Sequence, residues 1–168
     1  MFKGGVALVQ DLQQEVRRQN KITADWLLRI EERKAEYQEK RATLPRTDSG
    51  LVAIPPGKGG RDGDKTARAA VELADMDTYY RGWVNLVQDV ERSLPHDKLI
   101  LLRLRRQGLR FKDLQYHYSR ELQVHLGNRV PYKSRDWFNR VWKEIVEVAA
   151  RMAAERGLFK GGTFHVHP

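Results

Sequence analysis

Apolar residues recur at the three- and four-residue spacing of an α-helix over residues 6–42. The residues that mark this period are Val9, Leu12, Val16, Trp26, Ile30 and Tyr37. Thr23 is a suitable N-cap residue, so we expect a break near residues 20–23 and a second helix after it. A single narrow apolar stripe does not stabilise a helix by itself. These residues therefore predict an N-terminal helical arm over residues 1–42, which either packs on the rest of the chain or serves oligomerisation or partner docking.

The helical period stops after residue 42 and does not resume until about residue 65. The segment 43–64 holds five glycines and three prolines. Glycine weakens regular structure through its backbone freedom, and proline lacks the amide hydrogen that helices and inner strands require. We therefore expect residues 43–64 to be a linker without regular structure.

Helical periodicity returns over residues 65–157, which are expected to form one helical domain. Its first helix covers residues 65–93, with Asp64 as a candidate cap, and ends before Pro95. Proline is tolerated in the first turn of a helix, so a second helix is expected to follow at once. Gly108 suits the left-handed residue that closes this second helix.

Two more helices are expected after Gly108. One runs from about Phe111 to Gly127, and the next begins after Ser134, a good N-cap, and closes on Gly157. Residues 158–168 show no helical period and are expected to form a flexible tail. No stretch shows the alternation of a β-strand, so the sequence predicts an all-α fold.

Positive charge is concentrated in one part of this pattern. The whole chain has 31 Lys and Arg against 22 Asp and Glu, a net charge of +9. Residues 98–143 hold twelve bases and three acids, which accounts for the entire imbalance, and the remainder is neutral. Clustered Lys and Arg attract a polyphosphate and release its condensed counterions. This segment therefore indicates nucleic-acid binding, with a solvated basic helical surface as the alternative.

The helices of this basic segment are separated by glycine-containing turns, and bases stand at the start of the last helix. This is the pattern of a helix-turn-helix unit. The major groove of DNA admits one α-helix, whose first turns face base edges while the preceding helix crosses the backbone. We predict that the helix after Ser134 reads bases and that the preceding helix is its scaffold. The residues predicted to contact double-stranded DNA are Arg110, Lys112, Lys133, Ser134, Arg135, Asn139, Arg140 and Lys143.

The chemistry of these side chains fits the predicted contacts. An arginine can donate two parallel hydrogen bonds to guanine, and Asn139 can pair with adenine. Lys133 and Lys143 suit phosphates, and so do Arg110 and Lys112 at the start of the scaffold helix. The alternative is that the basic face of the last helix only solvates a helix packed in a bundle.

Several short features occur together in this domain. A long helix ends in Leu94-Pro95, an LRL stretch covers residues 102–104, Phe111-Lys112 opens the scaffold helix, and FNRVWKEIV stands in the last helix. With these features, residues 65 to about 152 resemble phage-encoded late-transcription regulators of the RinA and ArpU type, which are similar to region four of bacterial sigma factors. The resemblance implies a sigma-like helix-turn-helix activator that binds upstream of phage packaging and structural genes and contacts host RNA polymerase.

The chain departs from that family in one respect, because family members have a short scaffold helix and a tight turn before the reading helix. Here residues 116–134 intervene and leave the orientation of the reading helix open. Two other functions fit the same pattern. A small terminase subunit also joins a helix-turn-helix to helical oligomerisation arms, and a helical adaptor protein would use the basic patch to bind an acidic protein.

Residue content argues against several other classes of function. The absence of cysteine excludes disulfides, thiolate metal sites and a cysteine nucleophile. His117 and His125 lack a third ligand at suitable spacing, and no set of residues has the arrangement of a catalytic site. We therefore expect neither an enzyme nor a bound cofactor or metal. No segment approaches the roughly 18 apolar residues of a membrane span, so a cytoplasmic protein of the bacterial host cell is expected.

Overall fold

A computed structural model describes residues 4–43, 62–127, 130 and 132–159. These residues form six helices and no strand, which confirms the predicted all-α class for the described part of the chain. The helices are α1 (Gly4–Leu28), α2 (Ile30–Thr43), α3 (Asp62–Ser93), α4 (His96–Arg106), α5 (Phe111–Leu126) and α6 (Arg135–Glu155). Among the described residues, no helix is long and apolar enough to cross a membrane.

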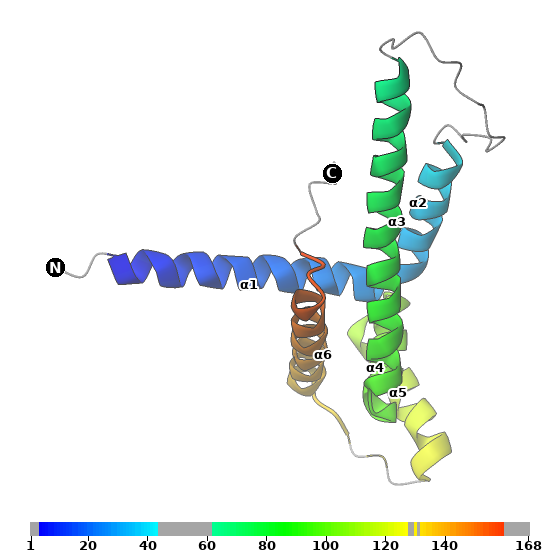
Figure 1. Cartoon of the computed structure of the whole chain (residues 1–168). Helices are drawn as coiled ribbons and strands as arrows, with labels where there is room; N and C mark the ends of the chain where they lie inside the picture. Colours follow the sequence, from blue (N-terminus) through cyan, green and yellow to red (C-terminus); the bar gives the residue numbers. More distant parts are fainter. Residues whose placement is uncertain (1–3, 44–61, 128–129, 131, 160–168) are drawn as a thin grey trace.

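The break in the N-terminal helical region lies later than the sequence predicted. The helix α1 continues through residues 20–23 to Leu28, and the chain bends at Arg29 before α2 begins. Thr23 is not a cap: it is fully buried, and its Oγ1 donates a hydrogen bond to the Gln19 carbonyl oxygen at 2.8 Å. A threonine bonded back to its own helix satisfies its hydroxyl inside the core without ending the helix. Beyond the bend, α2 runs alongside α3 (Figure 1).

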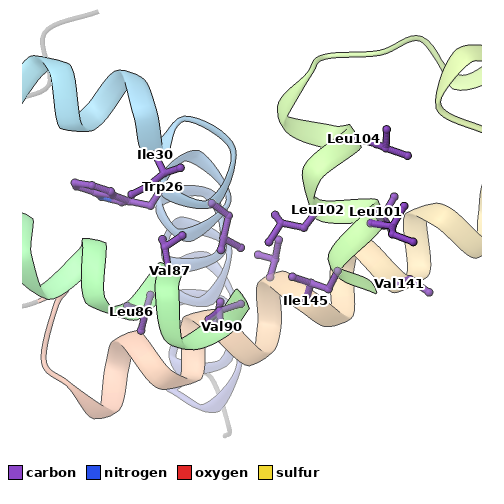
Figure 2. Close-up of a cluster of buried hydrophobic side chains, with 14 of the residues drawn as sticks. Trp26, Ile30, Leu86, Val87, Val90, Leu101, Leu102, Leu104, Val141 and Ile145 are labelled. Atoms are coloured by element: carbon purple, nitrogen blue, oxygen red, sulfur yellow. The ribbon is translucent and has the colours of Figure 1, made fainter. Parts of the chain in front are cut away.

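One hydrophobic core joins the N-terminal helices to the rest of the chain. Trp26 of α1 and Trp83 of α3 stack with ring centroids 5.3 Å apart, and Trp83 is 0% exposed. Figure 2 shows side chains of α1, α2, α3, α4 and α6 pointing into one cluster, including Ile30 of α2 and Ile145 of α6. Each fully buried aliphatic side chain of this cluster contributes about 1.5–3 kcal/mol of hydrophobic stabilisation. The predicted arm therefore packs on the rest of the chain at its C-terminal end, while the first half of α1 extends away from the other helices (Figure 1).

Most of the predicted linker, residues 44–61, lies outside the described residues. The helix α3 begins at Asp62, three residues before the expected start, so Asp64 is inside the helix and is not its cap. At the other end of the chain, Leu158 and Phe159 pack against the core although the sequence predicted a free tail from residue 158. Residues 160–168 lie outside the described part.

The helices α4, α5 and α6 end as the sequence predicted. Gly108, Gly127 and Gly157 all have positive φ, at 65°, 74° and 69°, the left-handed region that favours glycine. The hydroxyl of Ser134 accepts a hydrogen bond from the backbone N–H of Trp137 at 3.2 Å, which confirms Ser134 as the N-cap of α6. Both α5 and α6 pack on α4, but α6 also packs on α1 and α3.

Candidate nucleic-acid interface

The end of α4 and the starts of α5 and α6 meet at one place on the surface. The guanidinium of Arg135 in α6 lies 5.9 Å from the ring centroid of Phe111, the first residue of α5. The rings of Phe111 and Phe138 lie 5.8 Å apart and hold the two helix starts together. From α4, a guanidinium nitrogen of Arg105 donates a hydrogen bond to Oδ1 of Asn139 at 3.1 Å. Two helix N-termini, which favour anions, therefore lie beside a group of bases.

The predicted DNA-contacting residues are almost all accessible. Lys133 is half-buried, with its Nζ 4.7 Å from the centroid of the Trp137 ring. The predicted residues that are exposed are Arg110, Lys112, Ser134, Arg135, Asn139, Arg140 and Lys143. The structure brings Arg135 to the start of α5 and Asn139 to Arg105 near the end of α4. Arg140 and Lys143 lie further along α6.

Two of the predicted contacts are already engaged within the chain. The Oδ1 atom of Asn139 accepts the hydrogen bond from Arg105, so pairing with adenine requires release of that bond. The ammonium group of Lys143 lies 3.7 Å from a carboxylate oxygen of Glu147. Exposed pairs of this kind contribute little to stability, but this one reduces the positive charge that Lys143 offers to a phosphate.

Most bases of the segment 98–143 that the structure describes have no acidic partner. Apart from Lys143, the ion-paired bases are Lys98, which lies 3.1 Å from Glu144, and Arg106, which lies 2.5 Å from Glu91. The bases that form no ion pair with any described acid are Arg103, Arg105, Arg110, Lys112, Arg120, Lys133, Arg135 and Arg140. We call these eight residues the unpaired basic set. They lie on α4, on α5 or just before it, and on the first two turns of α6 or just before it.

Arg105 is a site residue that sequence reasoning did not single out. Its guanidinium lies 5.8 Å from the centroid of the Trp142 ring, and its buried Nε has no hydrogen-bond partner among the described residues. Burial, followed by the nearby charge of Arg135, lowers the pKa of Arg105. From the sequence, Arg103, Arg105 and Arg106 stand within four residues of one helix and cannot all be buried. That pattern does not indicate which of the three lies beside Asn139.

Arg106, next to Arg105, has a structural role instead. Its Nε donates a hydrogen bond to the carbonyl oxygen of Leu27 at 2.7 Å, near the C-terminal end of α1. Its guanidinium also pairs with Glu91 of α3. Arg106 therefore joins α4 to α1 and α3, and it satisfies a carbonyl that a helix end leaves without a partner. Adjacent arginines in one sequence run thus have different roles.

The surface carries two open depressions beside these bases. The first, of about 510 Å³, lies along α5 and is lined by Lys112, Gln115, Tyr116, Ser119, Arg120 and Gln123. The second, of about 540 Å³, lies at the start of α6 and is lined by Tyr132, Lys133, Ser134, Asp136, Trp137 and Arg140. Both are lined by donors of hydrogen bonds and by bases, and only the second includes an acid. Among the described residues, no group of three His, Asp or Glu side chains lies close enough to hold a metal ion.

Comparison with known proteins identified no relative of this chain. The chain matched no protein-family model, no curated protein and no solved structure. The charge, burial and geometry of the described residues are therefore the basis for assigning a function.

Proposed function

We propose that this chain binds double-stranded DNA through the unpaired basic set and acts as a transcriptional regulator. The observation that supports the proposal is the arrangement of these bases: they lie on or just before three successive helices, several of them near the starts of α5 and α6, without described acidic partners. Unpaired bases are free to replace the counterions of a phosphate backbone. A surface whose bases were internally neutralised would release far fewer counterions.

The first test is the salt dependence of DNA binding. Each neutralised phosphate contributes about 0.9 to the slope of log affinity against log salt concentration. We expect the full chain to bind a duplex of random sequence at low salt and to lose affinity steeply as salt rises. Lack of binding at low salt would overturn the proposal and would favour the adaptor function instead.

Matched variants locate the contact surface. Lys112→Gln and Arg110→Gln should each weaken binding to all sequences and reduce the salt slope by about one. Arg17→Gln on α1 removes the same charge from an exposed position outside the unpaired basic set. If all three variants lose the same affinity for DNA, the net charge of the chain, and not this surface, controls binding.

The regulatory part of the proposal rests on the resemblance of residues 65–152 to phage late-transcription regulators. In this proposal α4, α5 and α6 form a helix-turn-helix unit of the sigma region-four type, which activates phage or prophage late genes. Selection of bound fragments from host and phage genomes tests it, because a regulator should enrich sequences upstream of packaging and structural genes. In vitro transcription with host RNA polymerase tests whether the chain activates those promoters.

The projecting first half of α1 has an exposed apolar stripe, with Leu12 65% and Val16 49% exposed. In the proposal this stripe serves self-association or contact with RNA polymerase. The size of the protein in solution separates the regulator from the small terminase subunit. Light scattering that shows a monomer or dimer fits a regulator, whereas a ring of about eight or more copies fits packaging.

A further inference from the structure

The depression along α5 has an unusual set of side chains. They stand at positions 112, 115, 116, 119, 120 and 123, the spacing that places residues on one face of a helix. Two are bases, three are amides or hydroxyls suited to base edges, and one is an aromatic residue, Tyr116, that is 62% exposed. No acidic side chain lines the depression. Gln115 and Ser119 are half-buried in this depression and Gln123 is exposed. The helix also exposes two acids, Asp113 and Glu121, but neither lines the depression, which therefore offers hydrogen-bonding groups without a carboxylate among them.

The helix α6 also has acids on its exposed face, and one of them lines the depression at its start. Its exposed charged residues up to residue 151 are four bases, Arg135, Arg140, Lys143 and Arg151, and three acids, Asp136, Glu144 and Glu147. Bases and acids are mixed along the helix, and Asp136 lines the depression at its start, whereas no acid lines the depression along α5. Carboxylates inserted into a groove between two phosphate chains are repelled by them. The start of α6 is therefore less suited to the major groove than its bases alone suggest.

Packing also favours α5. The helix α6 is packed against α1, α3 and α4, which leaves one side open. The helix α5 packs mainly on α4 through Leu114, Tyr118 and Leu122, with ring contacts from Phe111 and Tyr118 to the start of α6. Its C-terminal end leads away from the other helices (Figure 1). A helix about 10–12 Å in diameter fills a major groove about 12 Å wide, so a helix that few other helices cover can enter it more deeply.

We propose that α5, and not the start of α6, is the helix that enters the major groove. Gln115, Ser119 and Gln123 contact base edges, where glutamine can make paired hydrogen bonds with adenine and serine can donate or accept. Lys112 and Arg120 contact phosphates at the sides of the groove. This inference rests on the proposed DNA-binding function and changes which residues read the sequence.

The start of α6 has a different role in this arrangement. Arg135 lies over the ring of Phe111 at the start of α5, and Lys133 lies over the ring of Trp137 in the first turn of α6. Bases at this position meet the phosphate chain at the edge of the groove that α5 occupies. They add affinity for every sequence and set the position of the protein along the duplex, without selecting bases.

The experiment first selects preferred duplexes from a random pool with the full chain. Binding of a selected duplex and of a random duplex is then measured for Gln115→Ala, Ser119→Ala, Gln123→Ala and for Asn139→Ala, Arg140→Ala in α6. Each α5 variant should lose about tenfold affinity for the selected duplex, the size of a lost base contact, and less than twofold for the random duplex. Each α6 variant should change both duplexes by the same factor. Unchanged helical content and melting temperature confirm that each variant is folded.

The outcomes separate this inference from the function on which it rests. If Asn139→Ala or Arg140→Ala changes the preferred sequence while the α5 variants do not, α6 is the reading helix: the inference fails and the DNA-binding function stands. If the unmodified chain binds random and selected duplexes equally, no helix reads bases and the inference also fails. If the chain binds no duplex at low salt, the proposed function itself fails.

Discussion

Charged residues are arranged differently in the N-terminal helices and in the α4–α6 region. Along α1 and α2, bases and acids pair three residues apart on the same helix, as in Arg18 with Glu15 and Lys34 with Glu31, both at 2.8 Å. In α4–α6, eight bases form no ion pair with any described acid. Pairs within a helix contribute only a few tenths of a kcal/mol each, so their main effect is to cancel charge. Four bases of α1 and α2 also lack a described acidic partner, namely Arg17, Lys21, Lys40 and Arg41, but residues 4–43 hold seven acids against eight bases. The excess positive charge of the chain therefore lies in the α4–α6 region.

Aromatic residues differ between the same two regions. Trp26 and Trp83 are buried and stacked at the junction of α1 and α3. Trp137 and Trp142 are half-buried, and each has a base beside its ring, Lys133 in one case and Arg105 in the other. One set of indoles therefore stabilises the fold, and the other supports the basic surface.

The largest expected effect is the loss of stability in Trp83→Ala. Removing a fully buried indole leaves a cavity and costs about 3–5 kcal/mol of unfolding free energy. Trp142→Ala removes the same side chain from a half-buried position and should cost clearly less. Urea denaturation followed by circular dichroism measures both, with Trp83→Phe as a milder variant if the alanine variant does not fold. Equal losses for the two alanine variants would contradict the contrast between the indoles.

The second effect concerns the most buried base of the paired region. Arg33 lies over the Trp26 ring and pairs with Asp25 and Glu36. Burial lowers the pKa of Arg33, but the two carboxylates outweigh it and the pKa is raised. Arg33→Gln should reduce the unfolding free energy by about 1 kcal/mol. Arg17→Gln, which removes an exposed base of α1, is the control and should leave stability unchanged.

The third effect is a gain of stability in Tyr118→Phe. The hydroxyl of Tyr118 is buried without a hydrogen-bond partner among the described residues, so its removal should add about 1 kcal/mol at neutral pH. Burial, with a smaller contribution from Asp97, raises the pKa of Tyr118 to about 12 from 10.0. Because the folded chain favours the neutral phenol over the phenolate, the raised pKa contributes stability below pH 10. That contribution is lost as the pH rises from 10 to 12. Between pH 10 and 12, the unfolding free energy should fall less steeply in the variant than in the unmodified chain. Parallel declines would contradict the raised pKa of Tyr118.

The smallest effect tests repulsion within the unpaired basic set. Arg135 lies close enough to lower the pKa of Arg105, after the larger effect of burial. Arg135→Gln should therefore raise the unfolding free energy at low salt by a few tenths of a kcal/mol, the size of other exposed charge interactions. The gain should vanish at high salt because salt screens it. A loss of stability at low salt would mean that the contact of Arg135 with the Phe111 ring outweighs its repulsion with Arg105.

Local features of the chain were predictable from sequence. The N-cap at Ser134 and the glycines that end α4, α5 and α6 depend on one residue and the backbone next to it, and the structure confirms them. The exposure of Asn139, Arg140 and Lys143 followed from helical periodicity in the same way. The bend after α1 was predicted wrongly because the role of Thr23 depends on its burial, which distant helices decide.

The sequence by itself determined that the described chain is helical, where most of its helices end, and which segment holds the excess positive charge. Only the tertiary structure decided which bases are neutralised. Arg106 reaches the carbonyl of Leu27, 79 residues away, and Lys98 pairs with Glu144, 46 residues away. It also decided that α6 packs on three other helices whereas α5 packs mainly on α4. Helix formation depends on neighbours along the chain, whereas hydrogen bonds and ion pairs act over a few ångströms between residues that only folding brings together.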